Sequence, residues 1–214
     1  KTLPRQILTN HQLKTAFINE VKVLKMLNHQ NIVKLIRVLE DSESVYIVME
    51  YPGQLTLQEF LDKRLASSKN PKGTISHIFL QLLEAVSYLH QSDVAHLDLK
   101  LENVIITSKL QVKLIDFGFS RTNSGNSVED LWVGTPQFMA PELASKSAYF
   151  PTKVDKWALG IILFKLLTNE FPFRGSSQAE VHCSILKDFK NLKDKNFPLP
   201  FSLILENLLN PDPK

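Results

Sequence analysis

Apolar residues recur along the chain at two different spacings, and these spacings predict its secondary structure. Over residues 11–28 an apolar side chain returns every three or four positions, as on one face of an amphipathic helix. Residues 74–90 repeat this pattern with a broader apolar face, and residues 152–168 are apolar on nearly all sides. We therefore predict two amphipathic helices and one helix buried in a core.

Shorter signals predict further helices. Thr56 and Glu59 stand three positions apart, as in a capping box, which predicts a short helix that continues to about Leu65. Residues 177–180 repeat the same spacing, and residues 201–209 predict a last helix.

Runs rich in β-branched residues predict strands. Residues 32–39 and 44–50 are joined by a polar turn and predict one pair of strands, and residues 104–107 and 112–115 predict another.

The composition restricts the kind of protein. The chain has 214 residues, 43% of them hydrophobic, which suffices for a sizeable core in one or two domains. Its formal charge of +3 comes from interspersed charges and not from a basic block, so we expect no binding to nucleic acid or membranes. The longest apolar run, residues 158–167, is too short to span a bilayer, which takes roughly 20 residues.

The cysteine and histidine residues further restrict the location of the protein and the kinds of site that it can have. The single cysteine, Cys183, excludes an internal disulfide and fits a reducing compartment, so we predict an intracellular location, cytoplasmic or nuclear. The histidines have no spacing typical of metal ligands, and we predict no zinc site.

The candidate chemistry is concentrated between residues 94 and 118. Asp98, Lys100, Asn103 and Asp116 lie there on two polar loops that flank the second predicted pair of strands. Transfer of a phosphoryl group needs a carboxylate to orient the attacking hydroxyl, oxygen ligands for a metal ion, and a cation near the developing charge. These side chains can supply all of them, so the segment indicates phosphoryl transfer.

This segment resembles the catalytic and metal-binding loops of eukaryotic protein kinases. It reads H-L-D-L-K-L-E-N and then D-F-G, where the family has H-R-D-L-K-x-x-N and D-F-G. G-T-P-Q-F-M-A-P-E at 134–142 and V-D-K-W-A-L-G at 154–160 follow in the family's order. The resemblance implies a two-lobed α+β protein kinase-like fold with a truncated small β lobe and a large, mostly helical lobe. Residues 1–49 would be part of the N-terminal lobe, with its regulatory helix and last two strands, and residues 50–214 the C-terminal lobe.

The resemblance implies a protein serine/threonine kinase that transfers the γ-phosphate of ATP, with Mg²⁺, to protein substrates. Asp98 would orient the acceptor hydroxyl and take its proton, and Lys100 would neutralise the transferred group. Asn103 and Asp116 would bind Mg²⁺. Lys100 and Thr135 are typical of the Ser/Thr type, and the sequence is most similar to the calcium/calmodulin-dependent and AMP-activated kinase-like group.

The resemblance also implies an ATP site. Glu20, on the first predicted helix, matches the glutamate that pairs with the lysine of the α- and β-phosphates, and Lys1 is the candidate for that lysine. No strand that would precede Lys1 is found in the sequence.

The hinge beside adenine corresponds to Met49, Glu50, Tyr51 and Pro52. The family usually donates a backbone N–H to adenine at the position of Pro52, and proline has none. Because such a bond is worth about 1 kcal/mol, we expect ATP to bind a few-fold more weakly.

Two further positions concern the substrate and regulation. Glu102 matches an acidic residue that in some relatives binds arginine upstream of the acceptor, so we predict a preference for basic peptides. Leu97 replaces the arginine that holds a phosphate of the activation loop, and Leu131 occupies the usual phosphorylation position. We therefore expect activity that does not depend on phosphorylation there.

Other motif residues have structural roles by resemblance. His96, Phe117 and Leu24 would form an apolar column, and Asp155 would brace the catalytic loop by accepting backbone N–H bonds. Thr152, three residues before Asp155, also fits a helix N-cap.

Alternatives stay open. The family's Gly-x-Gly-x-x-Gly loop is absent, which indicates either a fragment, the interpretation we favour, or a reduced small lobe. Together with Leu97 and Pro52, this absence also permits a pseudokinase-like scaffold, against which the intact Asp98, Asn103 and Asp116 argue. A small-molecule kinase of related fold is the other alternative, which the G-T-P and A-P-E motifs disfavour. The oligomeric state is not predicted.

Overall fold

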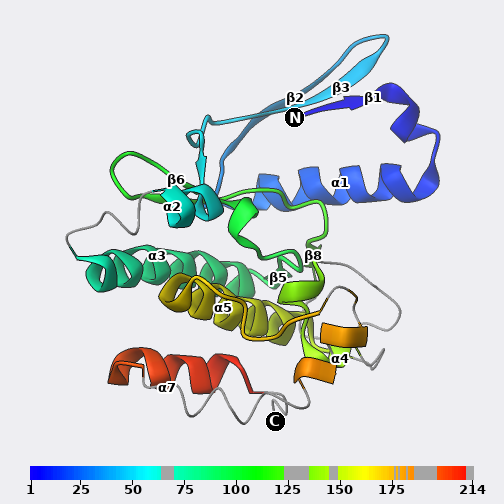
Figure 1. Ribbon diagram of the computed structural model, residues 1–214. Helices are drawn as coiled ribbons and strands as arrows, with labels where there is room; N and C mark the ends of the chain where they lie inside the picture. The colour runs from blue at the N-terminus through cyan, green and yellow to red at the C-terminus, as the bar shows by residue number, and fades with distance from the viewer. Residues whose placement is uncertain are drawn as a thin grey trace.

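A computed structural model describes residues 1–63, 70–122, 135–144, 149–175, 177, 179–181, 183–185 and 197–210. A β-sheet with one helix packed along it forms one layer, and a stack of helices forms the other (Figure 1). Short strands and loops lie between these two layers.

The first sheet contains three strands in the order β1-β3-β2. β2 (Leu35–Glu40) and β3 (Ser44–Met49) form the predicted antiparallel pair, and β1 (Thr2–Pro4) pairs with the other side of β3. The sequence predicted only two strands here, and β1 adds a third. The short 3₁₀ helix η1 (Arg5–Leu8) then leads into α1 (His11–Met26).

α1 is the amphipathic helix predicted from the sequence. Its N-cap is Asn10, whose side chain accepts a hydrogen bond from the backbone N–H of Leu13 at 3.1 Å. Its inner face buries Val23 and Leu24 together with one charged side chain, Glu20. A buried carboxylate needs a partner, and that partner lies at the candidate active site.

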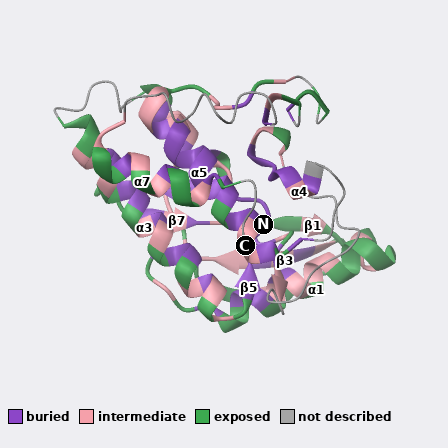
Figure 2. Ribbon diagram, turned by 90° about the horizontal axis from the view of Figure 1, so that it is seen from below, coloured by how far each residue is buried: buried purple, intermediate pink, exposed green. Residues whose placement is uncertain are grey.

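The helical layer is built around α5. Its helices are α2 (Leu57–Lys63), α3 (Pro71–Gln91), α4 (Pro141–Ala144), α5 (Pro151–Thr168) and α7 (Leu199–Leu208). Figure 2 shows that α5 is buried along most of its length, as its uniformly apolar sequence predicts. α7 packs closely on it, because a Cβ at Gly160 would lie 2.6 Å from Cδ2 of Leu209. The predicted helix around 177–180 and the end of the helix near Leu65 fall partly outside the described residues.

Two of the predicted helix starts were tested by the structure. The capping box is confirmed: Glu59 accepts from the backbone N–H of Thr56, and the Thr56 hydroxyl accepts from the N–H of Glu59. The N-cap at Thr152 is wrong, because α5 starts one residue earlier, at Pro151, and Phe150 is its N-cap. Proline fits the first helical position, where no N–H is needed.

Short strands position the two polar loops. β4 (Leu55–Thr56), β6 (Val104–Ile106) and β7 (Val112–Leu114) form one sheet, and β5 (Val94–Ala95) pairs with β8 (Arg121–Thr122). The first loop runs from β5 through η3 (Leu101–Asn103), and the second joins β7 to β8. Another 3₁₀ helix, η4 (Pro136–Phe138), precedes α4.

In the part of the chain that the structure describes, no helix has the length and apolar character needed to cross a membrane.

Candidate active site

The carboxylate of Asp98 is held in place on the loop after β5. Its Oδ2 accepts from Lys100 Nζ at 2.7 Å and from Asn103 Nδ2 at 2.9 Å. Asn103 Nδ2 also donates to the backbone carbonyl of Asp98 at 2.8 Å. Among the described residues nothing donates to Oδ1 of Asp98, although the residue is only 5% exposed. This oxygen is therefore the one that can accept a hydrogen bond from a substrate.

Asp116 lies on the second loop in a strained conformation. Its φ of 60° falls in the left-handed region, which is unfavourable for residues other than glycine. Residues with this backbone conformation are often found at functional sites. Its Oδ1 accepts from Lys1 Nζ at 3.1 Å and from the N–H of Gly118 at 3.4 Å. Burial raises the pKa of this carboxyl, but the charge and hydrogen bond of Lys1, together with the N–H of Gly118, outweigh burial, so the pKa lies below its usual value.

Lys1 joins α1 to this loop. Its Nζ lies 2.9 Å from both carboxylate oxygens of Glu20, so the ion pair implied by the resemblance is present. Burial lowers the pKa of the Lys1 side chain, but the hydrogen bond and the charge of Glu20, together with those of Asp116, raise it by more. The pKa of Lys1 therefore lies above its usual value. The backbone of Lys1 is also tied to the sheet through Ile47, next to β1. Lys1 is thus held at the start of β1, a strand that follows it in the chain.

Gly118 keeps this corner open. A Cβ at Gly118 would stand 3.4 Å from Oδ1 of Asp116 and 3.9 Å from both Glu20 Oε2 and Lys1 Nζ. A side chain here would therefore occupy the space directly beside the two carboxylates and the ammonium.

The polar atoms at the two loops fit Mg²⁺ bound together with phosphate. Mg²⁺ in such sites takes one or two carboxylates, keeps several waters and uses substrate phosphates for the rest. Oδ2 of Asp116 and Oδ1 of Asn103 accept no hydrogen bond from the described residues, so both oxygens are free to bind a metal. The described residues contain no group of three or more His, Cys, Asp and Glu arranged for a metal.

His96 connects the two loops. Its Nδ1 accepts from the backbone N–H of Asp98 at 3.3 Å, and its Nε2 lies 3.1 Å from the carbonyl oxygen of Ile115. Burial lowers the pKa of the imidazole, and a neutral ring with its proton on Nε2 satisfies both contacts. Its ring meets that of Phe117 edge-on at 5.0 Å, and Leu24 belongs to the same core. These contacts support a structural role for His96.

Asp155 braces the first loop from α5. Its two carboxylate oxygens accept the backbone N–H groups of His96 and Leu97, each at 2.8 Å. Oδ2 also lies 2.9 Å from Nε2 of His90 at the end of α3. Asp155 is completely buried, so it has the bracing contacts that the resemblance implied.

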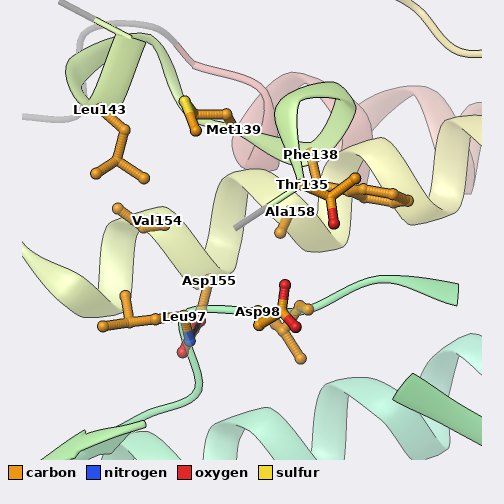
Figure 3. A pocket seen from close by; sticks show the side chains of 10 residues that line it. Leu97, Asp98, Thr135, Phe138, Met139, Leu143, Val154, Asp155 and Ala158 are labelled. Carbon is orange, nitrogen blue, oxygen red and sulfur yellow. Dashed lines mark hydrogen bonds between the residues drawn. The ribbon is translucent and has the colours of Figure 1, made fainter. Parts of the chain in front are cut away.

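Leu97 points its side chain into an apolar environment. Figure 3 shows it below Val154 and Leu143, in a pocket that Asp98 also lines. These residues line a small cavity of about 10 Å³ together with Met139 and Thr135. Leu97 is 3% exposed and has a φ of 63°. The position at which the resemblance implies an arginine is thus filled by a leucine in hydrophobic contact. Leu131, at the position predicted for phosphorylation, lies outside the described residues.

The predicted hinge lies at the end of β3 and forms a group separate from the loops. Glu50 accepts from Lys113 Nζ on β7 and, at 3.0 Å, from the backbone N–H of Lys34. Tyr51 is exposed, and Met49 and Pro52 are half-buried. The backbone N–H of Glu50 also donates to the carbonyl of Lys34 at 2.9 Å, so both the side chain and the N–H of Glu50 are engaged with the protein.

The remaining predicted residues and contacts stand at the edge of the site. Glu102 is exposed on η3, and Thr135 precedes η4.

Sequence reasoning missed the Glu50–Lys113 pair and the hydrogen bond of 2.6 Å from Asn19 Nδ2 on α1 to the carbonyl of Ser120. These partners lie 63 and 101 residues apart, and no local pattern signals either contact.

The chain is similar in sequence to known proteins. A family profile described as "Protein kinase domain" matches residues 1–214. The chain is 34% identical over 167 residues to "Probable serine/threonine-protein kinase MARK-A" of Dictyostelium discoideum, which covers 78% of this chain and 16% of the relative. It is 33% identical over 186 residues to "Serine/threonine-protein kinase SIK3 homolog" of Danio rerio, which covers 87% of this chain and 15% of the relative. The aligned part therefore spans only about one sixth of the length of these relatives.

Proposed function

The chain belongs to the protein kinase domain family, and from this premise we propose that it transfers the γ-phosphate of ATP to serine or threonine hydroxyls of protein substrates. The resemblance predicted from the sequence and its α+β, two-lobed fold class are confirmed by the match over the whole chain. Both relatives are named as serine/threonine-protein kinases, in agreement with the predicted type and subgroup.

The arrangement around Asp98 carries this proposal. Lys100 and Asn103 hold Oδ2 of Asp98 and leave Oδ1 to orient the acceptor hydroxyl and take its proton. Lys100 Nζ, 2.7 Å from the same carboxylate, brings a positive charge to the place where the transferred group would be attacked. A scaffold that only binds partners has no need for a carboxylate held in this way.

The ATP side of the proposal rests on Lys1, Glu20 and Asp116. When Mg·ATP is bound, ATP would supply the phosphoryl group, and Mg²⁺ would neutralise the negative charge on the phosphate oxygens. Asn103 and Asp116 offer the oxygens for Mg²⁺, and Glu20 orients the Lys1 ammonium toward the phosphates. We assign residues 49–52 to the adenine side, where Pro52 offers no N–H.

Three finer features belong to the same proposal. Glu102 is exposed and negatively charged, which supports a preference for basic peptides. We place the division between the lobes at residues 49 and 50, where β3 ends and the hinge begins. We also propose an intracellular location, cytoplasmic or nuclear, because a kinase of proteins acts where ATP is available.

The test compares transfer of labelled γ-phosphate from Mg·ATP to a mixed Ser/Thr peptide pool by the purified chain and by its Asp98→Asn variant. We expect the variant to transfer phosphate at least about 100-fold more slowly, because a positioned general base accelerates such reactions by about that factor. Asp62→Asn, at an exposed carboxylate on α2, is the matched control and should retain full activity. Equal background transfer by all three proteins, with unchanged melting temperatures, would instead favour the scaffold.

A further inference from the structure

A large groove lies at the end of α1, away from the residues assigned to catalysis. It has a volume of about 580 Å³, which is within the usual range of ligand sites. One wall comes from the last turn of α1 and the residues that follow it, including Lys25 and Asn28. The other wall comes from Lys34 and the first half of β2. No residue that we place at the phosphates, the hinge or the acceptor hydroxyl lines this groove.

The groove combines an apolar floor with a basic rim. Leu24 and Leu27 are buried in its floor, and Ile36 is 59% exposed beside them. Three exposed cations, Lys25, Lys34 and Arg37, also line it, and no lining residue is acidic. None of these cations forms an ion pair within the part of the chain that the structure describes. The rim therefore carries uncompensated positive charge.

The wall formed by β2 is the edge of a sheet. In the order β1-β3-β2 the described residues pair with only one side of β2, so the other side presents backbone N–H and C=O groups that an extended chain can pair with. The register between β2 and β3 shifts between Leu35 and Arg37, which leaves Ile36 without a partner residue on β3. The edge is thus an irregular strand with an exposed apolar residue at the mouth of the groove.

We propose that this groove binds an extended acidic segment of a protein partner, one that alternates carboxylates with aliphatic residues. An added strand presents its side chains alternately to two sides, so aliphatic residues can face the floor while carboxylates reach the cations. The positive rim selects against basic segments, and the apolar floor selects against segments without aliphatic residues. This inference does not depend on the catalytic activity of the chain.

The probe is a fluorescein-labelled octapeptide, Asp-Leu-Glu-Val-Asp-Leu-Glu-Val, whose binding to the purified chain is followed by fluorescence anisotropy. The matched peptide replaces every carboxylate by its amide, Asn-Leu-Gln-Val-Asn-Leu-Gln-Val. The groove variant carries Lys25→Glu, Lys34→Glu and Arg37→Glu. The control variant carries Lys14→Glu, Lys72→Glu and Lys109→Glu, at exposed positions outside the groove. Each reversal changes the charge by two, so both variants shift the formal charge by six, from +3 to −3.

We expect the acidic peptide to bind the wild-type chain and the control variant with closely similar affinity, and the groove variant at least about tenfold more weakly. We expect binding to weaken as salt rises, because the rim charges are exposed to solvent. Both variants should melt at temperatures close to that of the wild-type chain, and a second groove variant, Ile36→Ser, should weaken binding without a change of charge.

Several outcomes would overturn the proposal. Equal affinity for the acidic and amide peptides, or equal loss in both triple variants, would show that the groove does not select carboxylates. Displacement of the peptide by single-stranded DNA as efficiently as by unlabelled peptide would indicate a nucleic-acid site. Concentration-dependent dimerisation that the groove variant abolishes would make a second copy of the chain the occupant. Absence of peptide binding to the wild-type chain would also refute it.

Discussion

Removal of the Asp155 carboxylate should destabilise the whole fold, and the size of the effect follows from its contacts. Asp155 is completely buried and accepts the backbone N–H groups of His96 and Leu97, each at 2.8 Å. Asp155→Ala leaves both donors buried without a partner, and each such donor costs about 1 to 3 kcal/mol. We therefore expect the free energy of unfolding to fall by about 2 to 6 kcal/mol, a large share of the roughly 5 to 15 kcal/mol typical of a domain.

Asp155→Asn separates the hydrogen bonds from the volume of the side chain. The amide retains one acceptor oxygen, so only one of the two N–H groups loses its partner, and the loss should be about 1 to 3 kcal/mol. Asp62→Asn on the surface of α2 should change the stability by less than about 0.5 kcal/mol. The order of stability should be wild type, then Asn, then Ala.

Urea denaturation followed by circular dichroism and by tryptophan fluorescence measures these differences, because Trp157 lies within α5 two residues from Asp155. The midpoint should shift while the dependence on urea concentration stays constant, as for a change in stability alone. If Asp155→Ala cost less than about 1 kcal/mol, the two N–H groups would have found other partners, and the bracing role would be refuted.

Four further expectations concern separate residues. Pro52→Ala restores a backbone N–H at the hinge and should tighten ATP binding a few-fold by calorimetry, the gain of about one hydrogen bond; unchanged affinity would show that adenine does not use this position. Ser120→Ala removes a buried hydroxyl that has no hydrogen-bond partner in the described structure, so chemical denaturation should show stability unchanged or raised by about 1 kcal/mol. Burial lowers the pKa of His96, so the unfolded state binds the proton more readily, and stability should fall as pH drops below about 6.5, by at most about 1.4 kcal/mol per pH unit; a flat profile between pH 5 and 6.5 would contradict this. Because Leu97 and Leu131 replace the usual arginine and phosphorylation site, phosphatase treatment should leave peptide phosphorylation intact, and its loss through a modified site between residues 116 and 142 would refute the reasoning.

The sequence predicted best the features that depend on local spacing. The amphipathic face of α1 and the capping box of α2 follow from residues three or four positions apart, and the structure confirms both. The start of α5 was misplaced because Thr152 satisfies the capping pattern equally well, whereas Pro151 at the first helical position decides it. Local patterns therefore predicted which helices are present more reliably than they predicted where each helix begins.

Features that depend on distant pairing could not be predicted in this way. β1 is three residues long and ends in proline, so only its pairing with β3 makes it a strand. The resemblance implied the pairing of Lys1 with Glu20 and the bracing by Asp155, but not the bonds that hold Asp98. The contacts of Glu50 with Lys113 and of Asn19 with Ser120 join segments whose separation in sequence leaves no periodic trace.

The ion pairs of Lys1 have a consequence for the order of folding. Lys1 bonds to Glu20, 19 residues away, and to Asp116, 115 residues away. Contacts of long sequence separation form late, because the loop between them must first be closed. At a synthesis rate of about 5 to 20 residues per second, Asp116 would be made roughly 6 to 23 seconds after Lys1. The bond between them can therefore form only once more than half of the 214 residues have been made, so any function that needs this bond would report that the first sheet and the loop after β7 have come together.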